Sequence, residues 1–219
     1  MTLPASPAPV GAASGGAVVG LLLAAGIGRR FDAGGRRNKL LARLPDGQTI
    51  VAASARALCS VLDHVAVVVP SRSALLEAAL SDLPVRLIRN ARAKDGMGTS
   101  IATGIAELEA AFPHARGWLI ALGDMPFVSP RTIRTIADSI GVQDARIVAA
   151  CHAGRRGHPV GFDRSLSAEL AALDGDVGAN VLMRVHGVRA VECDDPGVVR
   201  DIDTPGDLQA VPLEHAAGR

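Results

Sequence analysis

The stretch Val18-Val19-Gly20-Leu21-Leu22-Leu23-Ala24-Ala25-Gly26-Ile27-Gly28 decides the fold of this 219-residue chain. Its first six residues are continuously apolar, which is typical of a strand buried on both faces of a parallel sheet. The glycines that follow allow a tight turn and let backbone N–H groups approach an anionic ligand. The stretch therefore predicts a buried strand whose carboxyl end carries a binding loop.

Short β-branched runs alternate with longer helical patterns along the rest of the chain. Further strands are predicted at residues 65–69, 85–88, 118–122, 147–150, 160–162 and 188–192. Helices are predicted at residues 49–61, 73–80, 99–111, 166–173 and 179–185, with others opening at Ser129-Pro130 and near Pro205. This alternation predicts an α/β fold, in which a mostly parallel sheet has helices on both faces. Ligand sites are expected at the carboxyl ends of its strands.

The domain organisation and the composition narrow the classes of partner. We interpret residues 1–16 as a disordered leader and 17–219 as a single domain. Lysine and arginine (23) nearly balance aspartate and glutamate (22), and aromatic residues are only 2%, which argues against binding to nucleic acid. The longest apolar run, residues 17–28, is too short to span a membrane. Three widely spaced cysteines without a CxxC pair fit a reduced, cytoplasmic setting.

A basic segment follows the first loop. Residues 29–43 contain one acid, Asp32, and six basic side chains, namely Arg29, Arg30, Arg36, Arg37, Lys39 and Arg43. A glycine turn followed by fixed positive charge suits a polyphosphate. The segment is neither a dinucleotide fingerprint, because Phe31 replaces the third glycine, nor a Walker A loop. Taken alone, the segment fits an ordinary strand-to-helix turn with a solvated basic loop about as well as it fits a polyphosphate site.

Acidic residues follow two later strands. Asp124 comes directly after a buried strand, where it could hold Mg²⁺ together with phosphate oxygens or, alternatively, cap the next helix. Asp201 and Asp203 lie on the same side of an extended segment and offer a second metal contact. Taken alone, this acidic segment fits an exposed turn that caps the helix at Pro205 better.

Two smaller features complete the pattern. Asp95-Gly96-Met97-Gly98-Thr99-Ser100 predicts a flexible turn that enters a helix and is suited to contact a base or a phosphate. We interpret His158 as structural, because a lone histidine more often has that role than a catalytic one. Met97, Trp118 and Cys151 are assigned to packing.

The segments LLLAAGIGRRF, NKLL, GMGTSI, LGDMP, GHPVGF and DIDTPGDL occur in this order. Together they resemble the MobA-like NTP transferase family, with the closest likeness to its molybdenum-cofactor cytidylyltransferase (MocA-like) branch. The resemblance covers nearly the whole chain after residue 17. It implies a three-layer α/β/α, Rossmann-like nucleotidyltransferase fold with a mostly parallel sheet.

The resemblance also implies roles for individual residues. Arg30 and Lys39 would bind the triphosphate, and Asp124 would coordinate Mg²⁺ together with Asp201, with Asp203 as the close alternative. The nucleotide would lie on the first loop and on the turn at residues 95–100. The implied nucleotide-binding residues are Leu23, Ala24, Ala25, Gly26, Gly28, Gly96, Gly98, Thr99 and Ser100.

The implied reaction is Mg²⁺-dependent transfer of CMP from CTP to the phosphate of molybdopterin, with release of pyrophosphate. Ala25 favours CTP, because the cytidylyl branch reads Leu-Ala-Ala-Gly where the guanylyl branch reads Leu-Ala-Gly-Gly. A molybdenum hydroxylase that receives the cofactor is the implied protein partner. The alternatives are a related transferase that uses GTP or another phosphorylated acceptor, and an accessory protein that hands cofactor to such a hydroxylase. The chain departs from the pattern at Asp32 and in a longer spacer at residues 33–37.

Overall fold

The computed structural model of the protein describes residues 16–26, 31 and 38–209. Most of the predicted leader lies outside these residues, so the division into a leader and a single domain stays a prediction. Within the described part, one seven-stranded sheet has the order β3-β2-β1-β4-β6-β5-β7. Its strands are β1 (Val18–Leu23), β2 (Val65–Pro70), β3 (Val85–Asn90), β4 (Gly117–Leu122), β5 (Ile147–His152), β6 (Arg155–Asp163) and β7 (Arg189–Glu192).

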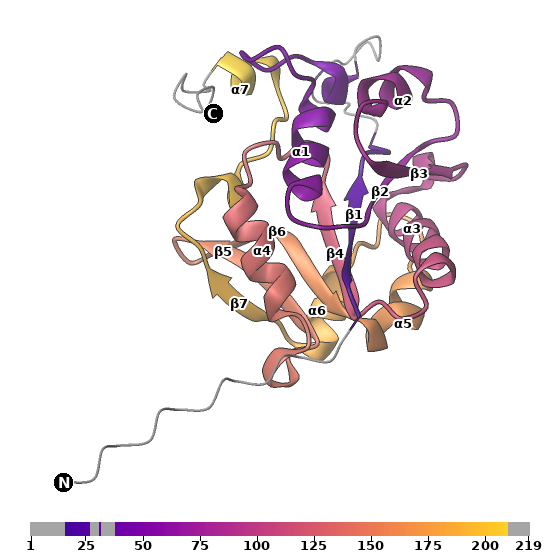
Figure 1. The fold of residues 1–219 in the computed structure, drawn as a ribbon, viewed down its shortest axis with the longest axis vertical. Coiled ribbons are helices and arrows are strands. Elements are labelled where there is room, and N and C mark those ends of the chain that lie inside the picture. Colours follow the sequence, from indigo (N-terminus) through magenta and orange to yellow (C-terminus); the bar gives the residue numbers. More distant parts are fainter. Residues whose placement is uncertain (1–15, 27–30, 32–37, 210–219) are drawn as a thin grey trace, which may run out of the picture.

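The described helices cover both faces of this sheet (Figure 1). One face packs against α1 (Ile50–Cys59), α2 (Ala74–Leu80) and α4 (Pro130–Ser139). The other packs against α3 (Met97–Ala111), α5 (Ser167–Ala171) and α6 (Asn180–His186). Shorter elements are η1 (Lys39–Leu41), η2 (Ala93–Asp95), η3 (Val142–Asp144), η4 (Arg164–Leu166), η5 (Pro196–Val199) and α7 (Pro205–Gln209). The predicted three-layer α/β/α arrangement is confirmed, and no helix of the described part is long and apolar enough to cross a membrane.

Strand β1 lies at the centre of both cores, as its unbroken apolar sequence predicts. Val18 and Leu22 belong to the core under α1 and α4, whereas Leu21 and Leu23 belong to the core under α3. Alternate side chains of a strand point to opposite faces, so one short run of apolar residues joins the two layers. Gly104 of α3 lets that helix lie close to β1, because a Cβ there would come within 2.7 Å of the Leu21 methyl groups.

The strand order reverses between β1 and β4. The chain leaves β1 to form β2 on one side, and β4 pairs with β1 in parallel on the other, with Leu23 opposite Leu122. In open α/β sheets this reversal opens a crevice at the carboxyl ends of the two strands. The N–H of Gly123 donates to the carbonyl of Leu23 at 2.9 Å, which ties the two loops together.

The sheet is parallel except at β6, which runs antiparallel to both β4 and β5. The predicted strand at 160–162 is therefore longer than expected and begins at Arg155. Ala153 and Gly154 both have positive φ and form a tight two-residue connection from β5. Such a turn supports a hairpin. Pairing with β5 along this hairpin extends β6 to the polar residues at its start.

Buried Asp195 connects the last part of the chain to the start of α4. Its Oδ2 accepts hydrogen bonds from the Ser129 N–H at 2.8 Å and the Thr132 hydroxyl at 2.7 Å. Its Oδ1 accepts from the Gly197 N–H at 3.0 Å. The predicted cap is confirmed, since the Ser129 hydroxyl accepts from the Thr132 N–H and proline occupies the first turn.

We expect Asp195→Ala to lower the free energy of unfolding by about 2 kcal/mol or more, because buried donors would lose their acceptor. Its exposed neighbour provides the control, and Asp194→Ala should change stability by less than about 0.5 kcal/mol. Chemical denaturation monitored by tryptophan fluorescence measures both changes. Equal effects of the two substitutions would show that the Asp195 carboxylate does not stabilise the fold.

Candidate functional site

Three carboxylates meet at the reversal point of the sheet. Asp124 follows β4, and Asp201 and Asp203 lie between η5 and α7. Ile202 fixes this segment, because its N–H donates to the carbonyl of Asp124 at 2.9 Å and its side chain is fully buried. One carboxylate oxygen from each aspartate lies within 4.8 Å of the others. The structure thus brings together Asp124 and both of its predicted alternative partners.

Lys39 extends into this aspartate cluster from η1. Its ammonium donates to Asp124 Oδ2 at 2.6 Å and to Asp203 Oδ1 at 3.0 Å, and its side chain is only 11% exposed. The side chain of Asn38 caps η1 by accepting from the N–H of Leu40, whose own side chain is buried. The backbone that carries Lys39 is therefore anchored on both sides.

The electrostatics of the cluster follow from this geometry. Burial alone would lower the pKa of Lys39, but hydrogen bonds to Asp124 and Asp203 and their charges outweigh it and raise that pKa. Burial and the charges of Asp203 and Asp124 raise the pKa of Asp201. Lys39 is therefore charged at neutral pH, and it is one cation beside three acidic side chains. Oxygen donors of this kind are those that Mg²⁺ and similar hard cations prefer.

A cleft of about 400 Å³ runs from Asp124 toward the start of α3. Its volume lies within the range of small-molecule sites. Five of the predicted nucleotide-binding residues line it, namely Leu23, Ala25, Gly26, Gly96 and Ser100. It is also lined by Ala93, Lys94, Met97 and Asp176, which the sequence did not indicate as site residues. Assigning Met97 to packing was wrong, because it faces this cleft and is 46% exposed, whereas Trp118 and Cys151 are buried as expected.

Three other predicted nucleotide-binding residues lie behind the cleft wall. Ala24 is buried and donates its N–H to the carbonyl of Val68. Gly98 donates its N–H to the carbonyl of Gly175, and the hydroxyl of Thr99 donates to backbone carbonyls of the preceding turn. These contacts shape the turn, and direct contact with a nucleotide stays a prediction. Gly28 and Arg30 lie outside the described residues.

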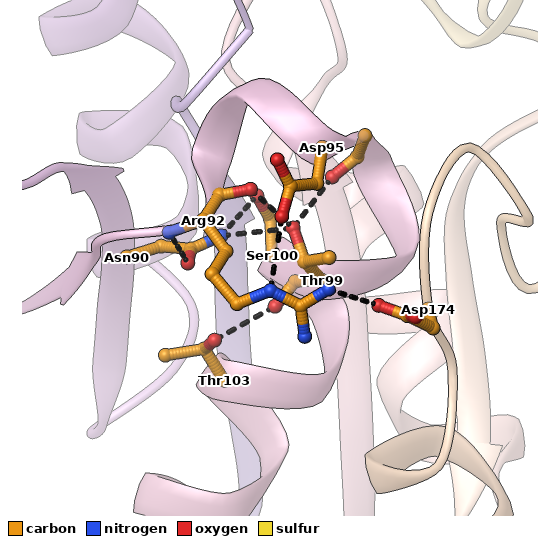
Figure 2. A network of polar contacts seen from close by, with 8 residues as sticks. Asn90, Arg92, Asp95, Thr99, Ser100, Thr103 and Asp174 are labelled. Atoms are coloured by element: carbon orange, nitrogen blue, oxygen red, sulfur yellow. Dashed lines mark hydrogen bonds and ion pairs between the residues drawn. The ribbon is translucent and has the colours of Figure 1, made fainter.

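Buried Asn90, at the end of β3, organises this turn and was missed by the sequence analysis (Figure 2). Its side-chain amide donates to the hydroxyls of Thr99 at 3.2 Å and Ser100 at 3.1 Å, and its oxygen accepts from the Arg92 N–H. The guanidinium of Arg92 contacts Asp95 and, across the cleft wall, Asp174 at 2.8 Å. Two segments far apart in sequence are thereby joined.

The segment 174–178 packs tightly against the turn because glycines face each other there. Gly96 has a φ of +128°, and a Cβ at this position would come within 2.5 Å of the Asp176 backbone nitrogen. Gly98 has no room for a Cβ beside the carbonyl of Val177 either. This contact makes the segment one wall of the cleft and places Asp176 on its lining.

His158 of β6 is half-buried and lines a small, mostly apolar cavity together with Ser54 and Met125. Burial lowers its pKa to about 4, although the nearby charge of Asp124 acts in the opposite direction. The imidazole is therefore neutral at physiological pH. Its structural role stays an interpretation.

We expect Gly96→Ala to lower the free energy of unfolding by about 1–3 kcal/mol, because the new methyl group overlaps the segment 174–178. Nucleotide affinity should fall with it, since that segment forms the cleft wall. Gly47→Ala is the matched control, because Gly47 also has a positive φ but has open space around it. Thermal unfolding and equilibrium titration with nucleotide measure both effects. Similar behaviour of the two variants would mean that backbone strain, not packing against the segment, accounts for the loss.

Comparisons with known proteins agree with this geometry. The nucleotidyl transferase Mth528 from Methanothermobacter is 26% identical, with a TM-score of 0.75 over 92% of this chain and 98% of that one. Rv0371c from Mycobacterium tuberculosis H37Rv, in a complex with manganese, is 28% identical, with a TM-score of 0.65 over 82% of this chain and 89% of that one.

The fold is shared more widely. The molybdopterin-guanine dinucleotide biosynthesis protein A from Archaeoglobus fulgidus is 18% identical, with a TM-score of 0.63 over 88% of this chain and 95% of that one. No curated protein matches the sequence. The family model for the MobA-like NTP transferase domain matches residues 20–191, which include most of the sheet and the cleft. The chain therefore belongs to the MobA-like NTP transferase family.

Proposed function

We propose that this nucleotidyltransferase transfers CMP from CTP to the phosphate of a molybdopterin-type acceptor and releases pyrophosphate. The observation that carries the proposal is the cluster of Lys39 with three aspartates at the end of a nucleotide-sized cleft. The cleft has apolar side chains and backbone that suit a nucleoside. At its end are charged groups of both signs, which suit a triphosphate with its metal. The reaction class follows from the family, and the choice of CTP and pterin is the proposal.

The proposed cofactor is Mg²⁺, held by Asp124 and Asp201, with Asp203 beside them. The donor set fits, because three carboxylate oxygens from two segments lie within 4.8 Å of one another. When bound, the ion would neutralise phosphate charge and so favour attack at phosphorus. A manganese complex of a relative supports a divalent ion in this family.

The residues of the chain would position the reactants and stabilise charge. An oxygen of the acceptor phosphate attacks the α-phosphorus of CTP, and the bond from that phosphorus to the bridging oxygen of the β-phosphate breaks. The electron pair leaves with pyrophosphate, so no protein nucleophile is needed. Lys39, and Arg30 in the proposal, would stabilise the charge that develops on the leaving pyrophosphate.

The cleft would hold the nucleoside. Leu23, Ala25 and Gly26 at the end of β1 offer apolar surface and close backbone approach, and Ser100 offers a hydroxyl from α3. The resemblance to the cytidylyl branch implies that Ala25 favours cytosine over guanine. A cytoplasmic location and a receiving molybdenum hydroxylase remain predictions of the same proposal.

Pyrophosphate release tests the reaction. The full chain, with Mg²⁺ and molybdopterin, is supplied in turn with CTP, GTP, ATP and UTP. We expect release with CTP and little with the other three, because the cleft should select the base. Release with GTP instead would support the related guanylyl transfer. Tight binding of nucleotide without release under all conditions would favour an accessory protein and reject the proposed reaction.

Asp124→Ala should reduce pyrophosphate release by about a hundredfold or more, because the proposed metal loses its central ligand. The fold should persist, since the backbone carbonyl that Ile202 contacts is retained. Asp138→Ala, on the exposed face of α4, serves as the control and should behave like the wild type. Circular dichroism confirms folding in both variants. Near-normal turnover of folded Asp124→Ala would exclude the metal role.

A further inference from the structure

The ammonium of Lys39 occupies part of the site at which a metal ion is proposed. It contacts one oxygen of Asp124 at 2.6 Å and one of Asp203 at 3.0 Å. The side chain of each of these aspartates is only 20% exposed. Lys39 therefore serves as a counter-ion for the carboxylates.

A divalent ion held by Asp124 and Asp201 would draw on a carboxylate that Lys39 already contacts, because Oδ2 of Asp124 accepts from its ammonium. Mg²⁺ binds its ligands at about 2.0–2.1 Å and demands a near-ideal geometry. It therefore does not readily bind an oxygen that also accepts a hydrogen bond from an ammonium. Two cations side by side also repel each other more strongly in a partly buried site than in water. A metal ion that takes Asp124 must therefore compete with Lys39.

The backbone that carries Lys39 is held by contacts that do not involve its ammonium. The backbone of η1 is held by the cap from Asn38 and by the buried side chain of Leu40. The lysine stem has four flexible carbons, so its end can move while its base stays in place. Triphosphate oxygens are suitable new partners, because a charge-assisted hydrogen bond to phosphate replaces one to carboxylate.

We propose that Lys39 exchanges between the aspartate cluster and the triphosphate, and that the divalent ion takes the place it leaves. Asp203 acts as the positioning residue that retains the ammonium when no ligand is bound. Metal alone then binds weakly, because it must expel Lys39, whereas metal and triphosphate bind together. This inference rests on the proposed function, since it assumes that both ligands enter this cleft.

Labelling of lysine amines tests the exchange in the unmodified chain. Lys39 and Lys94 are the only lysines of the sequence, and Lys94 is exposed. Acetylation by an activated ester, read by peptide mass spectrometry, should be slow at Lys39 in the free protein. Saturating Mn²⁺ alone should accelerate it about tenfold, as expected for a side chain that loses its ion pairs. Tripolyphosphate added with Mn²⁺ should slow it again. Exposed Lys94 is the internal reference for the step with Mn²⁺ alone, in which its labelling should change little.

Calorimetric titration with Mn²⁺ gives an independent measurement. Lys39→Met removes the competing charge and should bind Mn²⁺ alone about tenfold more tightly than the wild type. Arg134→Met removes an exposed positive charge on α4, away from the cleft lining, and should leave the affinity for Mn²⁺ nearly unchanged. Equal or weaker binding of Mn²⁺ by folded Lys39→Met overturns the proposal. If that variant does not fold, unchanged Lys39 labelling in Mn²⁺-saturated wild type overturns it instead.

The two proposals can fail separately. If no nucleotide gives pyrophosphate release but Mn²⁺ exposes Lys39 to labelling, the proposed reaction is wrong and the exchange stands. If the wild type releases pyrophosphate from CTP while Lys39 labelling and the affinity of Lys39→Met for Mn²⁺ are unchanged, only the exchange is wrong.

Discussion

Parallel pairing of β1 with β4 is the constraint on which the site depends. It sets Leu23 opposite Leu122 and so brings the turn after one strand beside the aspartate after the other. The hydrogen bond from Gly123 to Leu23 keeps the two loops in contact. Because β1 packs in both cores, a one-residue shift of its register would exchange the side chains of its two faces and disrupt the packing on both. The geometry of the cleft is thus protected by the hydrophobic packing beneath it.

Charge balance is the second constraint. Three carboxylates within 4.8 Å would repel one another strongly in a partly buried site, and Lys39 offsets part of that repulsion. The balance is incomplete, which leaves the cluster able to accept further positive charge. The same arrangement balances charge within the fold and, in the proposed function, would also recognise a metal–triphosphate complex.

Local patterns predicted the elements well, and contacts between distant segments explain the failures. The bounds of β1 and the cap at Ser129 follow from short-range chemistry and are confirmed. Asp124 was proposed because an acid directly after a buried strand is a recognisable signal, and the structure places it in the aspartate cluster. The polar start of β6, from Arg155, joins the sheet only through pairing with β5, which no local pattern reveals.

The second wall of the cleft was missed for the same reason. Met97 looked like a core residue by type, but its position is set by close packing of Gly96 and Gly98 on a segment nearly 80 residues later in the chain. A pair of glycines flanking an acid at 175–178 is the weak signal that could have pointed to Asp176. Gly28 and Arg30 lie outside the described residues and stay predictions.

The spacing of the charged groups along the chain has a consequence for biosynthesis. Lys39 meets partners 85 and 164 positions away, and the second of these lies near the last described helix. A nascent polypeptide emerging from the ribosome therefore carries Lys39 before either aspartate has been made, and both partners exist only after residue 203. The aspartate cluster should therefore form only after β4 and the segment that carries Asp203 have both left the ribosome.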